Sequence, residues 1–352
     1  MNLSAYKLGY FPNTPDLQRP GDRRRFVFYA REKNVSFQIA SPKQQYDIVY
    51  LTMGCNIAAW LRYRKQNPGV KIIFEIIDSY VLEKPGLLNL ARGLVRWLAK
   101  KESKLFLDYK KAMLSMVKCA DAVVCSSGTQ QQFLLKYNNN VHVSLDYFLD
   151  DINCFKTSYA SPGNKLKLVW EGQAYTVHNL LVLKNVLKNL SEKIELHIIT
   201  DPEVIFPFKI FNKKTKDILS GIACDKYFYT WQKESFAKLL SQMDLAVIPI
   251  GSHDALHWNK PENKLLMLWQ TGIPTLTSNT PAYTKVMNTA NLQFLCSTEE
   301  EWTRKIEQYM EMDEQSRMAH FSKATQYLNN HHTKEIILKK WDAIFESVIM
   351  CK

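Results

Sequence analysis

Short apolar runs alternate with longer amphipathic segments along the first half of the chain. Parallel strands buried on both faces appear as continuous apolar runs, whereas the helices that connect them carry one apolar stripe. The pattern predicts strands at 7–11, 35–40, 47–53, 70–77, 122–125 and 141–145. It predicts helices at 22–33, 56–66, 87–119 (in two pieces) and 129–137. Such alternation indicates a parallel α/β sheet.

A second alternation begins after a polar stretch at 150–164, which contains Ser161-Pro162-Gly163 and is typical of a linker. It predicts strands at 166–170, 194–200, 226–230, 244–250, 274–277 and 292–296. It predicts helices at 178–190, 234–243, 261–271 and 298–310, and the C-terminal end is helical throughout. We therefore expect an α/β fold of two facing Rossmann-like, doubly wound domains, 1–155 and 156–325. C-terminal helices at 326–352 are expected to pack back across the domains.

The charge balance favours an anionic partner. The chain has 46 Lys and Arg against 34 Asp and Glu, a formal net charge of +12, and residues 1–155 hold 22 basic and 13 acidic groups. This field can attract nucleic acid, anionic lipid or a phosphorylated substrate. The basic residues lack interleaved aromatics and form no recognised nucleic-acid-binding motif, so nucleic acid is not expected as the partner.

Cysteine usage and hydropathy indicate a reducing compartment. The seven cysteines form no C-x-x-C pair, which is typical of reduced thiols rather than a disulfide framework or a zinc site. The first seven residues contain no apolar core of a signal peptide, and no apolar run approaches the roughly 18 residues that span a bilayer. A cytoplasmic location is expected, with any membrane contact peripheral.

The stretch 244–283 carries the clearest functional signal. A buried strand leads into a polar loop, Pro261 suits the first turn of the next helix, and Gly272 suits its end. Lys264 lies in that first turn, where a cation opposes the helix dipole unless an anion also binds there. Free backbone N–H groups beside an ammonium form a phosphate site. The alternative is that Lys264 is a solvated surface lysine.

Two motifs in this half resemble the GT-B glycosyltransferases, especially the large group of nucleotide-sugar-dependent enzymes that includes family four. The first is N-K-L-L at 263–266, followed by G-I-P at 272–274, T-S at 277–278 and P-A-Y at 281–283. The second is V-W-E-G-Q at 169–173 with H-N-L at 178–180, which is similar to the W-x-G-S opening of the C-terminal half in those enzymes. The two-domain layout agrees over nearly the whole chain.

The resemblance implies that the second domain binds a nucleotide-sugar and that the first binds the acceptor. It implies that Lys264 contacts the donor diphosphate, and that the donor is a co-substrate, with no tightly bound cofactor. The other expected donor-site residues are Asn263, Glu262, Gly172, Gln173, His178, His253 and Pro249. For the strand-to-helix loop at 171–179 the alternative is an ordinary turn, and for His253 a surface histidine.

The sequence departs from the family pattern at two acidic positions. Met267 stands where the family has the glutamate that binds the nucleotide ribose, and Asn259 stands where its partner acid would fall. Glu262 lies nearby but at no matching position. These departures leave open a catalytically inactive GT-B scaffold.

Glycosyl transfer to a hydroxyl needs a group that takes the acceptor proton when the reaction inverts. Asp78 follows the apolar strand at 72–77, and Asp16 and Asp22 flank the first loop, so these three are the candidate bases. A capping or hydrogen-bonding role is the alternative for each. His253 and His257 are four residues apart, but Pro249 and Gly251 indicate a loop and no third ligand follows, so no metal site is predicted. A D-x-D motif is also absent from the sequence.

The segment 84–118 combines nine basic and two acidic residues with leucines at helical spacing. A basic face beside an apolar face suits an anionic membrane surface. The alternative is a solvated helix whose leucines pack on the sheet. The resemblance favours the membrane, because many bacterial relatives act on lipid-linked acceptors.

These observations predict a glycosyltransferase that moves a sugar from a nucleotide-sugar to a hydroxyl of a glycan or lipid-linked acceptor. The resemblance implies a role in polysaccharide or lipopolysaccharide biosynthesis. A nucleotide-sugar epimerase of the same fold and a basic, non-catalytic binding protein remain alternatives.

Overall fold

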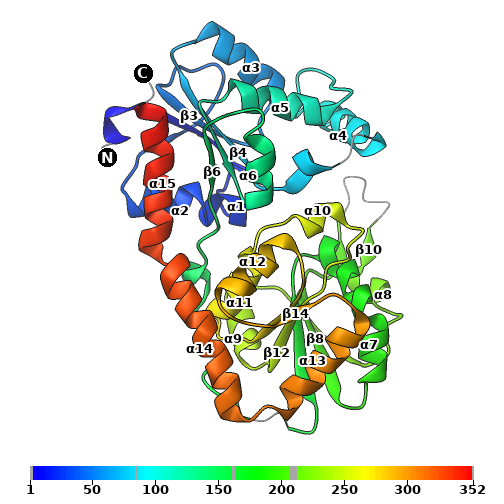
Figure 1. Ribbon diagram of the computed structural model, residues 1–352. Coiled ribbons are helices and arrows are strands. Elements are labelled where there is room, and N and C mark those ends of the chain that lie inside the picture. Colours follow the sequence, from blue (N-terminus) through cyan, green and yellow to red (C-terminus); the bar gives the residue numbers. More distant parts are fainter. Residues whose placement is uncertain (1–2, 84–85, 161–162, 206–211, 351–352) are drawn as a thin grey trace. The chain divides into compact units, whose positions relative to one another are not determined.

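The computed structural model describes residues 3–83, 86–160, 163–205 and 212–350 (Figure 1). Its contacts divide the chain into two compact units. Unit 1 comprises Met1–Tyr147, Asn259–Pro261 and Thr333–Lys352, and unit 2 comprises Phe148–Trp258 and Glu262–His332. The division thus falls eight residues before the boundary predicted from the sequence, and the last helix belongs to unit 1. Ser161 and Pro162 of the predicted linker lie outside the described residues.

Unit 1 is built on a parallel six-stranded sheet in the order β2-β1-β3-β4-β5-β6. Its strands are β1 (Leu8–Phe11), β2 (Gln38–Ile39), β3 (Ile48–Thr52), β4 (Lys71–Ile76), β5 (Ala122–Cys125) and β6 (Val141–Val143). Strands β3 and β5 are buried throughout, which explains their unbroken apolar sequences. The helices of unit 1 are η1 (Leu3–Ala5), α1 (Pro20–Arg23), α2 (Phe26–Glu32), α3 (Ile57–Gln66), η2 (Ser79–Leu82), α4 (Leu87–Leu98), α5 (Tyr109–Cys119), α6 (Gly128–Leu134) and α15 (Lys334–Ile349).

Unit 2 repeats the design, with a parallel six-stranded sheet in the order β11-β8-β7-β12-β13-β14. Its strands are β7 (Leu166–Glu171), β8 (Ile194–Thr200), β11 (Asp225–Thr230), β12 (Leu245–Ile248), β13 (Thr275–Ser278) and β14 (Leu295–Cys296), with a small antiparallel pair of β9 (Glu203–Val204) and β10 (Lys213–Lys214). The helices of unit 2 are η3 (Leu149–Asp151), η4 (Ala174–Leu183), α7 (Lys184–Asn189), α8 (Thr215–Ile218), α9 (Phe236–Ser241), α10 (Ala255–Trp258), α11 (Asn263–Gln270), α12 (Pro281–Thr289), α13 (Glu299–Glu311) and α14 (Glu314–His331).

The predicted α/β class with two parallel, doubly wound sheets is confirmed. In unit 2, β7 and β12 are hydrogen-bonded neighbours, with Leu245 opposite Leu168. The carboxyl ends of these parallel strands therefore meet at one edge of the sheet, where ligands of such folds bind. The loops that follow β7 and β12 are the segments on which the sequence placed the donor site.

The single helix predicted at 22–33 is wrong, because the chain leaves helical geometry at Arg25, with φ −127° and ψ −113°. The Arg25 side chain is completely buried, and its Nε lies 2.6 Å from Glu75 Oε1 and its Nη1 3.1 Å from Asp146 Oδ1. Burial raises the pKa of Glu75, against the lowering effect of the Arg25 charge. An ion-paired cluster thus sits where periodicity alone suggested the middle of a helix.

Six of the seven cysteines are described, and all six are free thiols. Cys351 lies outside the described residues. Burial raises the pKa of Cys125 and Cys296 to about 12, so these two thiols stay protonated at neutral pH.

His320 in α14 makes stability depend on pH. Its ring packs 3.7 Å, centroid to centroid, from that of Phe294 and is 7% exposed, and burial lowers its pKa to about 3. The unfolded chain protonates this histidine near pH 6.5, so its contribution to stability is complete above pH 6.5 and is lost progressively toward pH 3. Between pH 7.5 and pH 5.5, we expect the free energy of unfolding of the parent to fall by about 1.4 kcal/mol more than that of His320→Leu.

Urea unfolding of parent and variant at both pH values measures this difference. His331→Leu, on the same helix, is the control. Equal pH dependence of the parent and His320→Leu would contradict the assignment.

Candidate functional site

The end of β7 and the start of α11 lie against each other in unit 2. Lys264, the second residue of α11, donates from Nζ to the backbone carbonyl of Glu171 at 2.6 Å. The same ammonium lies 4.8 Å from the centroid of the Trp170 ring, within the range of a cation–π contact. The two motifs that resemble GT-B enzymes, 93 residues apart in sequence, therefore meet at this lysine.

Gly172 leaves the space that the lysine head occupies. A Cβ built on Gly172 would lie 2.5 Å from Lys264 Nζ and 3.0 Å from two atoms of the Trp170 ring. Any larger residue would therefore displace the ammonium or the indole. The glycine is required here for close approach rather than for an unusual backbone conformation.

Lys264 lies in the first turn of α11, and the backbone N–H groups in the first turn of a helix have no acceptor within that helix. Glu262 is the residue at the helix N-cap, and Asn263 is the first helical residue; both are half-buried. The positive end of the helix dipole and a lysine of the same turn both favour an anion such as a phosphate. The position of Lys264 is thus consistent with the anion site expected from the sequence.

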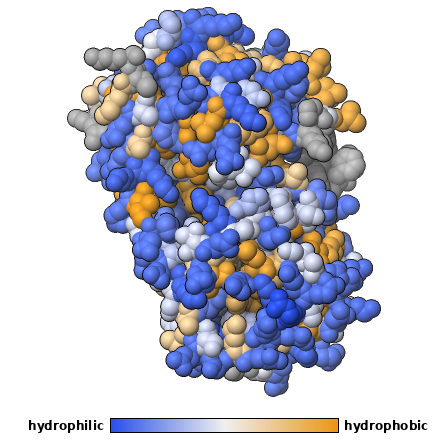
Figure 2. Space-filling model, viewed as in Figure 1, coloured by the Kyte–Doolittle hydropathy of each residue, from blue (hydrophilic) through white to orange (hydrophobic). Residues whose placement is uncertain are grey.

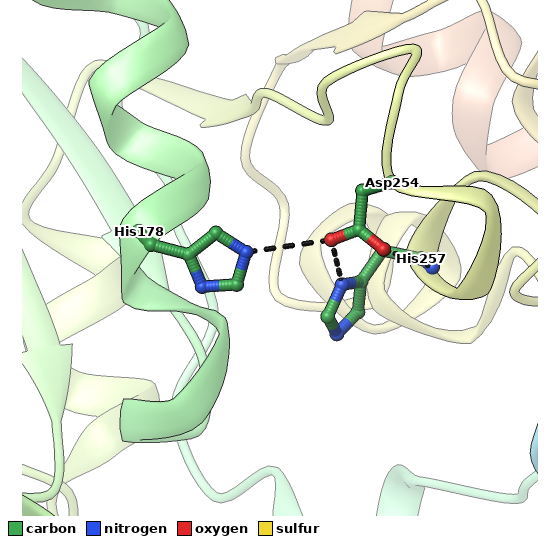
Figure 3. A group of neighbouring side chains, drawn as sticks. All are labelled: His178, Asp254 and His257. Atoms are coloured by element: carbon green, nitrogen blue, oxygen red, sulfur yellow. Dashed lines mark hydrogen bonds and ion pairs between the residues drawn. The ribbon is translucent and has the colours of Figure 1, made fainter. Parts of the chain in front are cut away.

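His178, Asp254 and His257 form a second cluster, in the loops that follow β7 and β12 (Figure 3). His178 comes from η4, Asp254 precedes α10, and His257 lies within α10. One carboxylate oxygen, Asp254 Oδ2, lies 3.3 Å from His178 Nε2 and also contacts His257 Nδ1. Burial alone would raise the pKa of Asp254, but its contacts with the imidazoles of His257 and His178 hold it below its ordinary value.

Two further contacts hold the loop that follows β12. Ser278 Oγ accepts from the backbone N–H of Ile250 at 2.8 Å, and Asn179 Oδ1 accepts from that of Gly251 at 3.4 Å. Pro249 is buried beside them, whereas His253 and Gln173 are exposed. His253 packs over Gly251 and takes no part in the cluster of His178, Asp254 and His257.

The sequence did not single out Asp254, Asn179 or Ser278 as site residues. The D-x-x-H spacing at 254–257 was a usable signal, because an aspartate three residues before a histidine can cap a helix and face its ring. The contribution of His178 could not be found this way, since it comes from 76 residues upstream.

Asp22 of unit 1 is placed for structure. It is completely buried and accepts from Tyr10 Oη at 2.5 Å, from the backbone N–H of Asn13 at 2.8 Å and from that of Thr14 at 3.2 Å. These bonds fix the loop after β1 and occupy both carboxylate oxygens. Asp16, in contrast, is exposed and caps the turn to Gln18; hydrogen bonds from Thr14 and Gln18 lower its pKa.

Asp78 keeps a more accessible carboxylate. It precedes η2 and is half-buried, and its Oδ1 lies 3.6 Å from Lys260 Nζ. Its backbone carbonyl accepts from Gln130 Nε2 at 2.9 Å, which fixes the chain after β4. Unlike the carboxylate of Asp22, that of Asp78 is therefore accessible to a ligand.

The two positions that depart from the family pattern have structural roles. Met267 is 4% exposed, on the buried face of α11. The backbone carbonyl of Asn259 accepts from Ser79 Oγ at 2.9 Å and from Ser127 Oγ at 3.4 Å. At neither position does the chain supply a carboxylate for a ribose.

No protein-family model matches the sequence, and no curated protein sequence does either. Solved structures do share its fold. A glycosyltransferase from Rickettsia africae is 12% identical, with 98% of each chain covered and a TM-score of 0.62. Anabaena HepE, solved with UDP, is 11% identical over 97% of this chain and 100% of its own, with a TM-score of 0.66. WaaG, a glycosyltransferase involved in lipopolysaccharide biosynthesis, is 13% identical over 97% and 99%, with a TM-score of 0.59.

These likenesses show the fold: the chain has the GT-B architecture of two Rossmann-like α/β domains. At 11 to 13% identity they carry no residue-level information about the site. What is said of individual site residues therefore rests on the contacts of the described residues.

Proposed function

We propose that the chain is a glycosyltransferase that uses a nucleotide-sugar as donor. The observation that carries the proposal is the position of Lys264, whose ammonium lies against the end of β7, in the space left by Gly172, at the first turn of α11. Three of the neighbours are glycosyltransferases by name or were solved with UDP, which supports this chemistry.

The residues divide the work as follows. Lys264 and the first N–H groups of α11 hold the diphosphate, and the ammonium stabilises the negative charge that grows on it as the sugar leaves. Asn263, Glu262, Gly172 and Gln173 are the proposed neighbours of the diphosphate. Asp78 is the proposed acceptor-side base if the reaction inverts, because Asp22 is sequestered by its hydrogen bonds. The donor is a co-substrate rather than a resident cofactor.

The test is a thermal-shift panel with UDP, GDP, dTDP and CMP. A nucleotide at 100 times its dissociation constant stabilises the folded state by about 2.7 kcal/mol, so one member should raise the melting temperature clearly. Stabilisation by none of them would contradict the proposal. Product analysis with donor alone separates a transferase from an epimerase, since only the epimerase converts the sugar without an acceptor.

The surface of unit 1 supports the proposed class of acceptor. Helix α4 presents an apolar stripe outward: Leu87 is 83% exposed, Trp97 43% and Leu98 59%, and Leu90 and Leu94 complete the stripe. Figure 2 shows hydrophobic side chains at the outer edge of unit 1, over this helix. Monomeric proteins rarely leave such a stripe in water, so it marks an interaction surface.

The charged residues of α4 turn inward. Arg92 Nη1 lies 2.8 Å from Glu83 Oε2, and its guanidinium stacks 3.9 Å from the Tyr80 ring centroid. Arg96 Nη2 donates to the carbonyls of Gly54 and Cys55 at 3.0 and 2.8 Å. The arginines therefore attach the helix, while Leu87, Leu90, Leu94 and Leu98 stay exposed. Lys84 of the predicted basic stretch lies outside the described residues.

Four exposed lysines follow α4 along the chain: Lys100, Lys101, Lys104 and Lys111. An apolar stripe bordered by cations complements an anionic bilayer surface, and each such cation adds about 1 kcal/mol of attraction. No helix among the described residues is long and apolar enough to cross a membrane. We propose that α4 rests on the cytoplasmic face of a membrane that carries a lipid-linked acceptor in polysaccharide or lipopolysaccharide biosynthesis.

Leu90→Asp with Leu94→Asp should weaken binding to vesicles by at least about tenfold, because each leucine contributes roughly 1.5 kcal/mol or more when buried. Co-sedimentation with phosphatidylcholine vesicles containing about one-third phosphatidylserine measures this. Leu181→Asp, an equally exposed leucine of η4 in unit 2, is the matched control. Equal binding of the α4 variant and the control would contradict the membrane proposal.

A further inference from the structure

The cluster of His178, Asp254 and His257 holds three atoms of the kind that transition metals prefer. The two ring nitrogens and the carboxylate oxygen all lie within 4.8 Å of one another (Figure 3). We propose that this cluster is a site for a divalent transition metal ion of the zinc class. The inference concerns the protein without donor and does not depend on the proposed function.

The first argument is the tautomer of His178. Its Nδ1 lies 3.1 Å from the backbone carbonyl of Tyr175, which can only accept, so Nδ1 carries the hydrogen. In the neutral ring, Nε2 then presents a lone pair toward Asp254 Oδ2 at 3.3 Å. Two lone pairs that face each other require a cation or an added proton between them. Metal-binding histidines commonly donate their other N–H to a carbonyl in this way.

The second argument is the orientation of Asp254. Its Oδ1 accepts from the backbone N–H of His257 at 3.1 Å and caps α10. This bond turns Oδ2 toward both imidazoles, and the backbone rather than the ion fixes the direction of the carboxylate. The ligands are therefore oriented before any metal binds.

One distance and the donor set favour this class of metal. Zinc–nitrogen and zinc–oxygen bonds of roughly 2.0–2.2 Å place tetrahedral ligands about 3.3 Å apart, which is the separation of His178 Nε2 and Asp254 Oδ2. Two imidazoles and one carboxylate suit zinc better than magnesium, which prefers oxygen ligands. Three protein ligands leave a fourth position for water or an anionic oxygen. His178 is 46% exposed on its side chain, so an ion can enter from solvent.

Reasoning from the sequence rejected a metal site because His253 and His257 had no third ligand. In the structure His253 is outside the cluster, and Asp254 and His178 join His257 instead. The spacing of four residues thus drew attention to His253 and His257, which do not belong to one cluster in the structure.

The test titrates ZnCl₂ into the chelator-treated full chain by isothermal calorimetry, and follows Co²⁺ binding by its visible absorption. We expect one Zn²⁺ per chain and the intense d–d bands of four-coordinate Co²⁺. His178→Ala and Asp254→Asn should each weaken Zn²⁺ binding by at least about tenfold. Asparagine keeps the Oδ1 cap on His257, so a loss in that variant is not a loss of α10.

His253→Ala removes an exposed histidine of the same loop and should bind Zn²⁺ like the parent. Unchanged melting temperatures of all three variants in EDTA show that the fold is intact. The proposal is overturned if the parent binds no Zn²⁺. It is equally overturned if His178→Ala and Asp254→Asn bind like the parent.

Discussion

Lys264→Ala should lower kcat/KM for the sugar donor by about 10²–10³, as expected when one group that stabilises developing charge is removed. The ammonium is held by the Glu171 carbonyl at 2.6 Å and by the Trp170 ring, so it is already positioned before the donor arrives. Steady-state kinetics with the nucleotide-sugar identified by the panel measures the loss. We expect kcat to fall and the donor KM to rise, because the charge binds the diphosphate and stabilises its departure.

Two further variants sharpen this test. Gly172→Ala should impair the enzyme in the same direction, because its methyl group would stand 2.5 Å from Lys264 Nζ. Lys285→Ala removes an exposed lysine of α12 in the same unit and should leave the kinetics unchanged. If Lys264→Ala matched Lys285→Ala, the lysine would not be a donor ligand.

Arg25→Met should lower the free energy of unfolding by about 3–5 kcal/mol. The guanidinium neutralises Glu75 and Asp146 in the interior of unit 1, and its Nη1 also donates to the Ser144 carbonyl at 2.8 Å. Methionine fills much of the volume but leaves two carboxylates buried without their cation. Urea denaturation at pH 7.5 measures the loss.

The loss should shrink as the pH falls. Burial already raises the pKa of Glu75, and without Arg25 it rises further above that of the unfolded chain. Protonation in the folded state then restores stability toward acid pH. Adding Glu75→Gln to Arg25→Met should recover part of the loss, and Arg62→Met, an exposed arginine of α3, should cost less than about 0.5 kcal/mol. A loss below about 1 kcal/mol for Arg25→Met would contradict this account of the cluster.

Buried strands were the most predictable part of the fold. The strands at 122–125 and 194–200 were predicted with their observed bounds. The first is an unbroken apolar run, as expected of a parallel strand buried on both faces, and the second is apolar at most of its buried positions. Helices were less predictable where a long-range contact decides the backbone. The predicted helix is interrupted at Arg25, because its side chain pairs with Glu75 and Asp146, which lie 50 and 121 residues away.

The candidate site was likewise predictable where the signal is local, and not where it depends on long-range contacts. The position of Lys264 at a helix start could be read from Pro261 and the helix that follows, because these are local signals. Its contact with Glu171 and Trp170 depends on the pairing of β7 with β12, which no local pattern reveals. Likewise, the segment at 87–98 was expected as an amphipathic helix, but which face points outward is decided by Glu83, Gly54 and Cys55, the partners of its arginines.

The most direct test of the account is a crystal structure of the chain with the nucleoside diphosphate that stabilises it. The account predicts the pyrophosphate within hydrogen-bond distance of Lys264 Nζ and of the first backbone N–H groups of α11, beside Gly172. A nucleotide bound elsewhere, with Lys264 still closed on the Glu171 carbonyl and no phosphate beside it, would contradict the proposed function.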